Sequence, residues 1–167
     1  MTTLLLAKAA GCTVIVTSSS DEKLKRVRED YGADHTINYK TNPSWGKEAV
    51  RINNGKGINF VVENGGSGTI AESFEAIAMG GKIAVIGFLS IASQDKMPDI
   101  AMLALSKAAV VRGITIGPKS DLEDLLQFVT SRKISVPIDK IFKFDQAIEA
   151  YKYMAASGHI GKVCIEM

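Results

Sequence analysis

Short apolar segments alternate with amphipathic segments along almost the whole chain. The apolar runs are rich in β-branched residues and have the length of strands, at residues 13–18, 35–39, 58–64, 82–88 and 110–117. Segments of helical period lie between them and begin near Asp21, Trp45, Thr69 and Pro98. Strands that alternate with helices in this way are typical of a parallel sheet covered by helices on both faces. The sequence therefore predicts an α/β fold with a doubly wound parallel sheet.

The same alternation continues beyond Gly117. Ser120 and Glu123 have the spacing of a capping box, which predicts the start of a helix. A strand, a helix and a final strand follow, at residues 138–142, 145–157 and 161–167. No linker, repeat or low-complexity segment interrupts the pattern. We therefore expect residues 1–117 and a closing segment, 118–167, to pack on the same core.

Composition and charge narrow the class of protein. The chain has 167 residues, of which 46% are hydrophobic and 23% charged, and this is typical of a globular domain with a core. The net charge of +2 gives no reason to expect nucleic acid as a partner. No apolar run is long enough to span a membrane, and the start lacks the pattern of a signal peptide. Cys12 and Cys164 lie in apolar contexts that favour buried free thiols, so we expect a cytoplasmic, metal-free protein.

Three serines end the first predicted strand. Ser18 and Ser19 precede Lys23, and hydroxyl groups beside an ammonium suit a phosphate dianion. In a doubly wound sheet the end of the second strand lies beside the ribose of a dinucleotide, where an acidic residue would favour NAD and repel a 2′-phosphate. The serines and Lys23 therefore fit an NADP-type pocket. The alternative is a capping box of Ser19 and Glu22 before a solvated helix, and the residues alone favour that alternative.

A glycine-rich stretch follows the third predicted strand. Residues 66–71 have the sequence GSGTIA, which matches the dinucleotide-binding pattern G-x-G-x-x-A between a strand and a helix. The acidic residue expected about 20 positions later is absent, because the next strand ends in Ile86, Gly87 and Phe88. A turn that lines the edge of a pocket is therefore favoured over a pyrophosphate loop.

The sequence offers few groups for acid–base chemistry. Glu63 is the best-placed carboxylate, at the end of a strand, either as a general base or as a polar anchor of the loop. Tyr39 ends another strand and either hydrogen-bonds a ligand or packs there. These two residues are the candidate catalytic groups. Lys162 either meets a phosphate or faces solvent, and His159, in a turn, is expected to be inert.

Six segments occur in a specific order along essentially the whole chain: LLLAKAAGCTVIVTSSSDEKL, YGADHTINY, VVENGGSGTIAESFEAIAMGGKIAVIG, RGITIG, FDQAIEAYKYM and GHIGKVCIEM. This series resembles the C-terminal part of the medium-chain dehydrogenase/reductase family, in its zinc-type alcohol dehydrogenase-like branch. The resemblance implies a Rossmann-like nucleotide-binding region in residues 1–117 and an oxidoreductase activity for the family.

The resemblance also implies cofactor-binding roles for particular residues. Ser18, Ser19 and Lys23 would hold the adenosine 2′-phosphate of NADP, and Tyr39 would border the adenosine. Lys162 would reach the pyrophosphate. Two strand ends would line the nicotinamide side, with Asn64, Gly65, Gly87, Phe88 and Leu89.

Parts of the family pattern have no counterpart in these residues. The family's first strand and glycine-rich turn would precede residues 4–10, and its catalytic domain with the zinc ligands is not represented. We therefore expect weakened NADP binding, no zinc, and no dehydrogenase activity from the chain alone. The missing strand is central in the family's sheet, and unpaired backbone groups there are costly. The gap would be repaired if the two halves closed up, if the terminal strand inserted, or if a second chain donated a strand.

The resemblance further implies a homodimer through the sheet edge from Val110 to Ile116. Three functions stay open at this point. The chain is a remnant of an NADP-dependent oxidoreductase, a repurposed isomerase, cyclase or lyase that acts on a small molecule without a cofactor, or a non-catalytic binding protein. NADP binding favours the first, a closed apolar pocket with perturbed ionisable groups the second, and a filled cleft the third.

Overall fold

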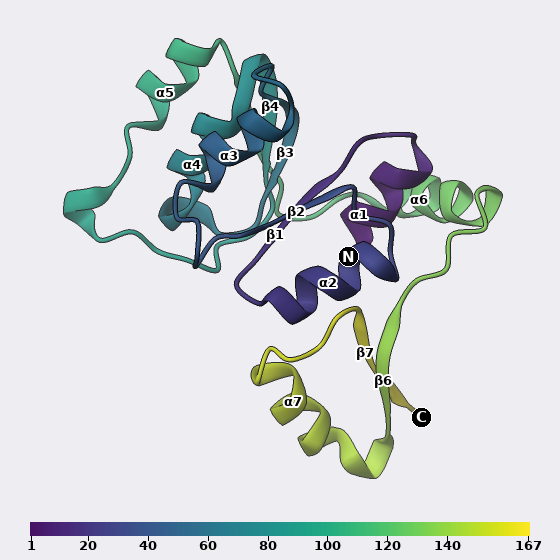
Figure 1. Cartoon of the computed structure of the whole chain (residues 1–167). Helices are drawn as coiled ribbons and strands as arrows, with labels where there is room; N and C mark the ends of the chain where they lie inside the picture. The colour runs from purple at the N-terminus through teal and green to yellow at the C-terminus, as the bar shows by residue number, and fades with distance from the viewer.

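All residues, 1–167, are described by a computed structural model in which strands and helices alternate (Figure 1). The strands are β1 (Ile15–Ser18), β2 (His35–Asn38), β3 (Ile58–Glu63), β4 (Ile77–Val85), β5 (Val110–Gly113), β6 (Ile138–Lys143) and β7 (Lys162–Glu166). The α-helices are α1 (Thr2–Ala9), α2 (Asp21–Glu29), α3 (Trp45–Ile52), α4 (Ile70–Ala76), α5 (Ile100–Lys107), α6 (Lys119–Ser131) and α7 (Ala147–Ala155). Every strand predicted from the apolar pattern overlaps one of these strands.

Every strand pair in the molecule is parallel. β1 pairs with β2, β4 lies between β3 and β5, and β6 pairs with β7. In the three-stranded sheet Val61 lies opposite Ile83, which in turn lies opposite Val111. Parallel neighbours need a crossover connection, and α2, α4, α5 and α7 provide it. The prediction of an α/β fold with a doubly wound, Rossmann-like parallel arrangement is confirmed.

The sheet is interrupted between β1 and β3. β1 is paired only with β2, and the outer edge of β3 carries no partner, so no backbone ladder joins the two sheets. The expectations that the two halves close up or that the terminal strand inserts are therefore wrong for this structure. The terminal strand β7 pairs with β6 instead, because α7 returns the chain beside β6 with Ile141 opposite Cys164. Strand donation by a second chain stays a prediction.

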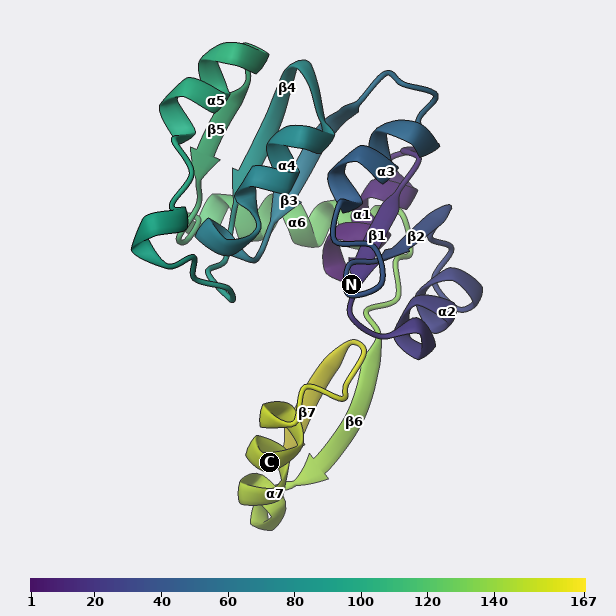
Figure 2. The same ribbon diagram turned by 60° about the vertical axis from the view of Figure 1, so that its left-hand side comes forward.

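Side-chain packing by α3 holds the two separated sheets together. Ala49 of α3 is buried in one cluster with Ile37 of β2 and Ala76 of α4. Ile15 of β1 and Ile58 of β3 pack against the same cluster. Figure 2 shows α3 beside α4, in front of the strands. β1 and β3 thus share a core although they share no hydrogen bonds.

The three-stranded sheet has its own core under α4 and α5. Phe74 of α4 and Ile83 of β4 are each 1% exposed and lie in one cluster with Ile70 and Ile77. Leu103 of α5 packs against this cluster. The carboxyl end of β3, which carries Glu63, is therefore built on a well-buried region.

The C-terminal unit, which comprises β6, α7 and β7, has its own two-stranded sheet and projects from the rest of the molecule as a separate lobe (Figures 1 and 2). Its Ile160 is buried with Leu4 of α1 and with Leu24 and Val27 of α2. The preceding helix α6 buries none of its residues. The closing segment therefore contributes a single buried side chain to the N-terminal core, and the predicted boundary at residue 117 stays a prediction.

Two helix caps differ from the predicted ones. The cap of α2 is Ser20, whose Oγ accepts a hydrogen bond from Lys23 N, rather than Ser19. The capping box predicted at Ser120 is wrong, because α6 already begins at Lys119. Both errors shift a boundary by one or two residues and leave the helices where they were expected.

The exposure of the two cysteines and the lengths of the helices test what the sequence predicted about buried thiols and membrane spans. Cys12 is exposed in the turn between α1 and β1, so the prediction of a buried thiol is wrong there. Gly11 adopts a φ of +81° in that turn, which carries the chain across the surface before β1 begins. Cys164 is partly buried in β7. None of the helices has the length and apolar character needed to cross a bilayer.

Candidate functional site

A pocket of about 340 Å³ lies where β1 and α2 face the chain that enters β7. Its polar lining includes Thr17 and Ser18 at the end of β1, Lys23 in α2, and His159 and Lys162 beside β7. Residues from opposite ends of the sequence therefore meet in one place, which we name the seam pocket. No carboxylate lines it.

The serine run places one wall of the seam pocket. Ser18 Oγ accepts a hydrogen bond from Ser20 N at 3.3 Å, and Ser20 Oγ accepts one from Lys23 N at 3.3 Å. These bonds turn the chain from β1 into α2, so that Lys23 falls in the first turn of the helix. Ser19 does not line the pocket. The run is thus both a helix cap and a pocket wall, because different serines perform the two roles.

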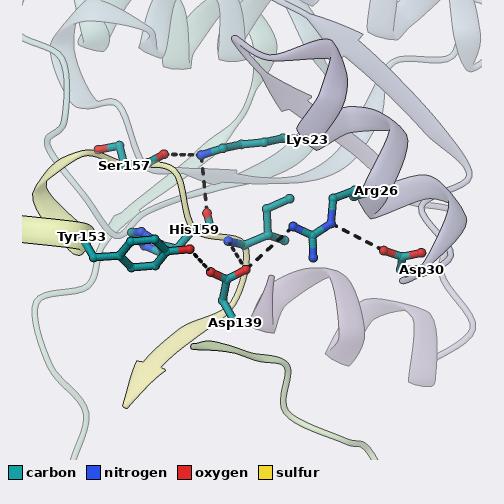
Figure 3. Close-up of polar contacts among 8 residues, drawn as sticks. Lys23, Arg26, Asp30, Asp139, Tyr153, Ser157 and His159 are labelled. Carbon is teal, nitrogen blue, oxygen red and sulfur yellow. Dashed lines mark hydrogen bonds and ion pairs between the residues drawn. The ribbon is translucent and has the colours of Figure 1, made fainter. Parts of the chain in front are cut away.

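Lys23 joins α2 to the turn that precedes β7 (Figure 3). Its ammonium donates hydrogen bonds to the backbone carbonyls of Ser157 and His159, the second at 3.4 Å. An ammonium has three N–H donors, so one donor stays available for a ligand. The lysine can therefore hold the seam together and still contact a ligand in the pocket.

Lys162 brings a second ammonium to the seam pocket from the start of β7. Its backbone N donates to Pro137 O at 2.8 Å, which fixes the start of β7 against the chain that enters β6. Two ammonium groups together with the hydroxyls of Thr17 and Ser18 favour an anion, and phosphate oxygens accept from all of these donors. Pockets for small molecules measure about 300–1,000 Å³, so the seam pocket suits one end of a dinucleotide.

His159 was expected to be inert, yet it lines the seam pocket. Its Nδ1 is the only buried side-chain nitrogen or oxygen without a hydrogen-bond partner. An unpaired buried polar atom costs about 1–3 kcal/mol, and such atoms commonly accompany a water or ligand site. The signal in the sequence was its place just before Gly161 and Lys162, but the burial of one ring nitrogen depends on the tertiary fold.

Glu63 ends β3, and its hydrogen bonds all come from the turn that follows and from α4. Its Oε1 accepts hydrogen bonds from Gly65 N at 2.6 Å, Gly66 N at 3.1 Å and Thr69 Oγ1 at 2.6 Å, and its Oε2 accepts from Ser73 Oγ. The residue is 4% exposed. An ionised carboxylate has about four acceptor sites, so these bonds occupy it. The arrangement fits the loop anchor and gives the hypothesis of a general base no support.

The glycine turn after Glu63 is closed by the loop that follows β4. Leu89 N donates to Asn64 O at 3.1 Å, Ser90 N donates to Gly65 O at 2.7 Å, and Gly68 N donates to Ser90 O at 3.1 Å. We name this paired region the glycine edge. It brings together all the residues expected on the nicotinamide side, Asn64, Gly65, Gly87, Phe88 and Leu89.

Close packing explains why glycines occupy the glycine edge. A Cβ on Gly66 would stand 2.5 Å from the Phe88 ring, and a Cβ on Gly87 would stand 2.7 Å from Asn64 O. Three N–H groups of the turn are hydrogen-bonded within the chain, so it lacks the row of free donors that a pyrophosphate needs. This geometry fits a turn at the edge of a pocket.

The remaining candidates lie apart from the seam pocket. Tyr39 N donates to Ser18 O at 3.1 Å, and the tyrosine is 44% exposed at the end of β2, outside the seam pocket. Its hydroxyl makes no hydrogen bond within the chain, so it is accessible to a ligand at the surface. No three His, Cys, Asp or Glu side chains are arranged to hold a metal ion, and none of the residues is assigned to zinc.

Similarity to known proteins covers nearly the whole chain. The profile described as zinc-binding dehydrogenase matches residues 1–131. A zinc-type alcohol dehydrogenase-like protein of Schizosaccharomyces pombe is 41% identical over 98% of this chain, which spans 47% of that protein. The chain thus corresponds to about half the length of this relative.

Solved structures also resemble this chain over nearly its whole length. A Sinorhizobium meliloti protein described as an alcohol dehydrogenase matches with a TM-score of 0.87 and 36% identity, over 98% of this chain and 46% of its own. An NAD-dependent alcohol dehydrogenase matches with a TM-score of 0.84 and 31% identity, over 98% of this chain and 46% of its own. Fold and sequence therefore agree. The chain belongs to the zinc-binding dehydrogenases, the zinc-type alcohol dehydrogenase-like branch of the medium-chain dehydrogenase/reductase family, and corresponds to their C-terminal nucleotide-binding part.

Proposed function

We propose that the chain is the cofactor-binding part of an NADP(H)-dependent oxidoreductase, and that the seam pocket takes the 2′-phosphate end of the cofactor. The observation that carries the proposal is the convergence of Ser18, Lys23 and Lys162 on one pocket without a carboxylate. Two ammonium groups and a hydroxyl stabilise a phosphate dianion and would be poorly satisfied by an uncharged ribose.

The end of β1 supports NADP over NAD. An acidic side chain at this place would accept hydrogen bonds from the ribose 2′-hydroxyl and repel a 2′-phosphate. Ser18 stands there instead, and Lys23 follows in the first turn of α2. One similar structure is described as an NAD-dependent enzyme and another as a complex with NADPH, so the cofactor differs among proteins of this fold.

Only cofactor binding is assigned to these residues. The bound cofactor would supply or accept a hydride, while Ser18, Lys23 and Lys162 bind and orient its adenosine end. Phe88 and Leu89 are 60% and 87% exposed at the glycine edge, where they would exclude water from the nicotinamide side. The chain spans 47% of its S. pombe relative, and we propose that groups beyond this chain complete the reaction.

The proposal also includes a homodimer through the free edge of β5. β5 pairs only with β4, and Val110 and Ile116 at this edge are 54% and 88% exposed. Apolar, unpaired strand edges favour pairing with another chain. Light scattering should give twice the mass of one chain, and Val110→Lys should give the monomer. A monomeric wild-type protein would contradict this part.

Calorimetric titration with NADPH and NADH tests cofactor binding. We expect NADPH to bind with a dissociation constant below about 100 μM and NADH to bind more weakly, because NADH lacks the 2′-phosphate. Lys23→Ala should weaken NADPH binding about tenfold, through the loss of a charge-assisted hydrogen bond. Lys25→Ala is the matched control, since Lys25 is an exposed lysine of the same helix that does not line the seam pocket.

Two results would count against the proposal. Equal losses of affinity in Lys23→Ala and Lys25→Ala would mean that the helix attracts the cofactor only by its general charge. No binding of either nucleotide would remove the oxidoreductase assignment for this chain. The hypotheses of a cofactor-free isomerase, cyclase or lyase, or of a non-catalytic binding protein, would then be pursued by screening small molecules.

A further inference from the structure

Asp139 of β6 is the centre of the polar contacts between the C-terminal unit and α2 (Figure 3). Its Oδ2 accepts a hydrogen bond from the Tyr153 hydroxyl at 2.6 Å, and its Oδ1 accepts one from Ile160 N at 3.3 Å. Arg26 of α2 places Nη1 3.8 Å from the same Oδ1. The Asp139 side chain is 9% exposed. One buried carboxylate therefore connects β6, α7, the chain before β7, and α2.

The contact between Arg26 and Asp139 is the only ion pair that joins α2 to the C-terminal unit. Arg26 is also held from its other side by Asp30, whose Oδ2 lies 3.7 Å from Nε. The guanidinium therefore lies between two carboxylates, one on its own helix and one on β6, at distances longer than a hydrogen bond. The orientation of the Asp139 carboxylate is therefore set by its hydrogen bonds to Tyr153 and Ile160, and the ion pair adds an attraction between the C-terminal unit and α2.

Asp139 accepts a hydrogen bond from the segment 159–162, and this segment also lines the seam pocket. Ile160, whose N–H bonds Asp139, lies between the His159 carbonyl that contacts Lys23 and the Lys162 ammonium. A shift of this segment would move both groups at once. The position of the pocket's ammonium groups therefore depends on a carboxylate that does not line the pocket.

We infer that Asp139 is a positioning residue for phosphate recognition in the seam pocket. It acts through Ile160 and Arg26 and does not contact the ligand. This inference rests on the proposed binding of the 2′-phosphate. It goes beyond that proposal because it makes ligand affinity depend on the docking of the C-terminal unit against α2. Coupling of this kind is reciprocal, so a bound ligand should also stabilise the docking.

The test compares two half-ligands that differ only in the 2′-phosphate, 2′,5′-ADP and 5′-AMP, by calorimetry on the whole chain. Wild-type protein should prefer 2′,5′-ADP, and Asp139→Asn should reduce that preference about tenfold, since a misplaced lysine loses its charge-assisted bond. A purely structural role would weaken both ligands equally and leave the preference unchanged. Asp145→Asn is the matched control, because Asp145 is an exposed carboxylate of the same unit without a side-chain contact.

A second variant covers the case in which Asp139→Asn does not fold. Tyr153→Phe removes one donor to Asp139 and keeps its charge, and it should reduce the preference about threefold. Fluorescence of Trp45, the single tryptophan, reports whether the N-terminal core is intact. Both variants must keep the wild-type emission.

The outcomes separate the inference from the proposed function. If Asp139→Asn prefers 2′,5′-ADP over 5′-AMP as strongly as the wild type does, the positioning role is overturned and the seam pocket remains the phosphate site. If only Tyr153→Phe folds, the same result in that variant has the same meaning. A wild-type protein without any preference for 2′,5′-ADP overturns the proposed function and the positioning role with it. A preference lost in Asp139→Asn and kept in Asp145→Asn supports both.

Discussion

β1 and β3 both end in a turn of small residues followed by a helix, yet the two ends use their polar groups differently. At the end of β3, the carboxylate of Glu63 is surrounded by four donors from its own turn and helix. At the end of β1, Ser18 and Lys23 line a pocket that also receives Lys162 from the far end of the chain. The first end is closed on itself, and the second is open to a ligand.

The difference shows that a sequence pattern after a strand does not make a nucleotide site by itself. The GSGTIA segment matches the dinucleotide motif more closely than the serine run does, but the N–H groups of its Gly66, Gly68 and Thr69 are already bonded within the chain. The motif recognises phosphate only where its N–H groups are free. The partners of the donors, rather than the residue pattern, separate the two ends.

The largest expected effect is at the closed end. Glu63→Ala removes the acceptor for two N–H and two O–H groups in a buried turn, so the free energy of unfolding should fall by about 3 kcal/mol. Urea denaturation measures this change. Glu75→Ala is the control, because Glu75 is an exposed carboxylate of the following helix without a hydrogen bond, and its effect should stay within about 0.5 kcal/mol.

The same variant can break the comparison. If Glu63→Ala keeps wild-type stability and loses NADPH affinity, the end of β3 binds the ligand and is not closed. If it loses stability and the folded fraction still binds 2′,5′-ADP normally, the two ends have the separate roles described here.

An intermediate effect is expected at the open end. Lys162→Ala should weaken NADPH binding about three- to tenfold, because one of the two lysine ammonium groups that line the seam pocket is lost. The loss should shrink as salt is added, since the site is open to solvent. Titration calorimetry at low and high salt measures both effects. Lys152→Ala, an exposed lysine of α7 away from the seam pocket, should bind like the wild type, and an equal loss there would contradict the assignment.

The smallest effect concerns the pH dependence of docking. The hydrogen bond from Tyr153 lowers the pKa of the Asp139 carboxyl below its usual value of 3.8, against the opposing effect of burial. The same bond raises the pKa of Tyr153 above its usual value of 10.0. The carboxylate therefore stabilises docking above pH 3.8 and loses this effect as the pH falls through its lowered pKa. The phenol stabilises docking below pH 10.0 and loses its effect as the pH rises through its raised pKa.

Amide NMR signals recorded as a function of pH measure the pH range over which the C-terminal unit stays docked on α2. The Ile160 amide should change at acidic pH while the Ile83 amide, in the core of the three-stranded sheet, keeps its position. In Tyr153→Phe the acidic change should move to higher pH, because the largest cause of the lowered pKa is gone. An Ile160 amide that is insensitive to acid would contradict the role of Asp139 in docking.

The pattern of apolar residues predicted the elements and their order, because local periodicity is a property of neighbouring residues. The strand β4 was the main local error. It begins at Ile77 and runs through Gly80 and Gly81, whereas the apolar run predicted a strand at residues 82–88. Gly80 adopts a φ of +70° inside the strand, so the glycines mark an irregular strand rather than the end of a helix.

The contacts of the seam pocket could be predicted only in part. Ser18 and Lys23 were recognisable because hydroxyl and ammonium groups follow a strand end. The bonds from Lys23 to Ser157 O and His159 O join residues more than 130 positions apart, and they depend on the path of the chain through α6. The same holds for Asp139, whose partners on three elements become neighbours only in the folded chain.

Titration of the isotopically labelled chain with 2′,5′-ADP, followed by amide NMR, tests the central claim most directly. The account predicts that the largest shifts fall on Ser18, Lys23 and Lys162, and that the Gly65 and Gly66 amides, bonded to Glu63, keep their positions. Shifts concentrated at Gly65 and Gly66, with the seam pocket silent, would contradict it.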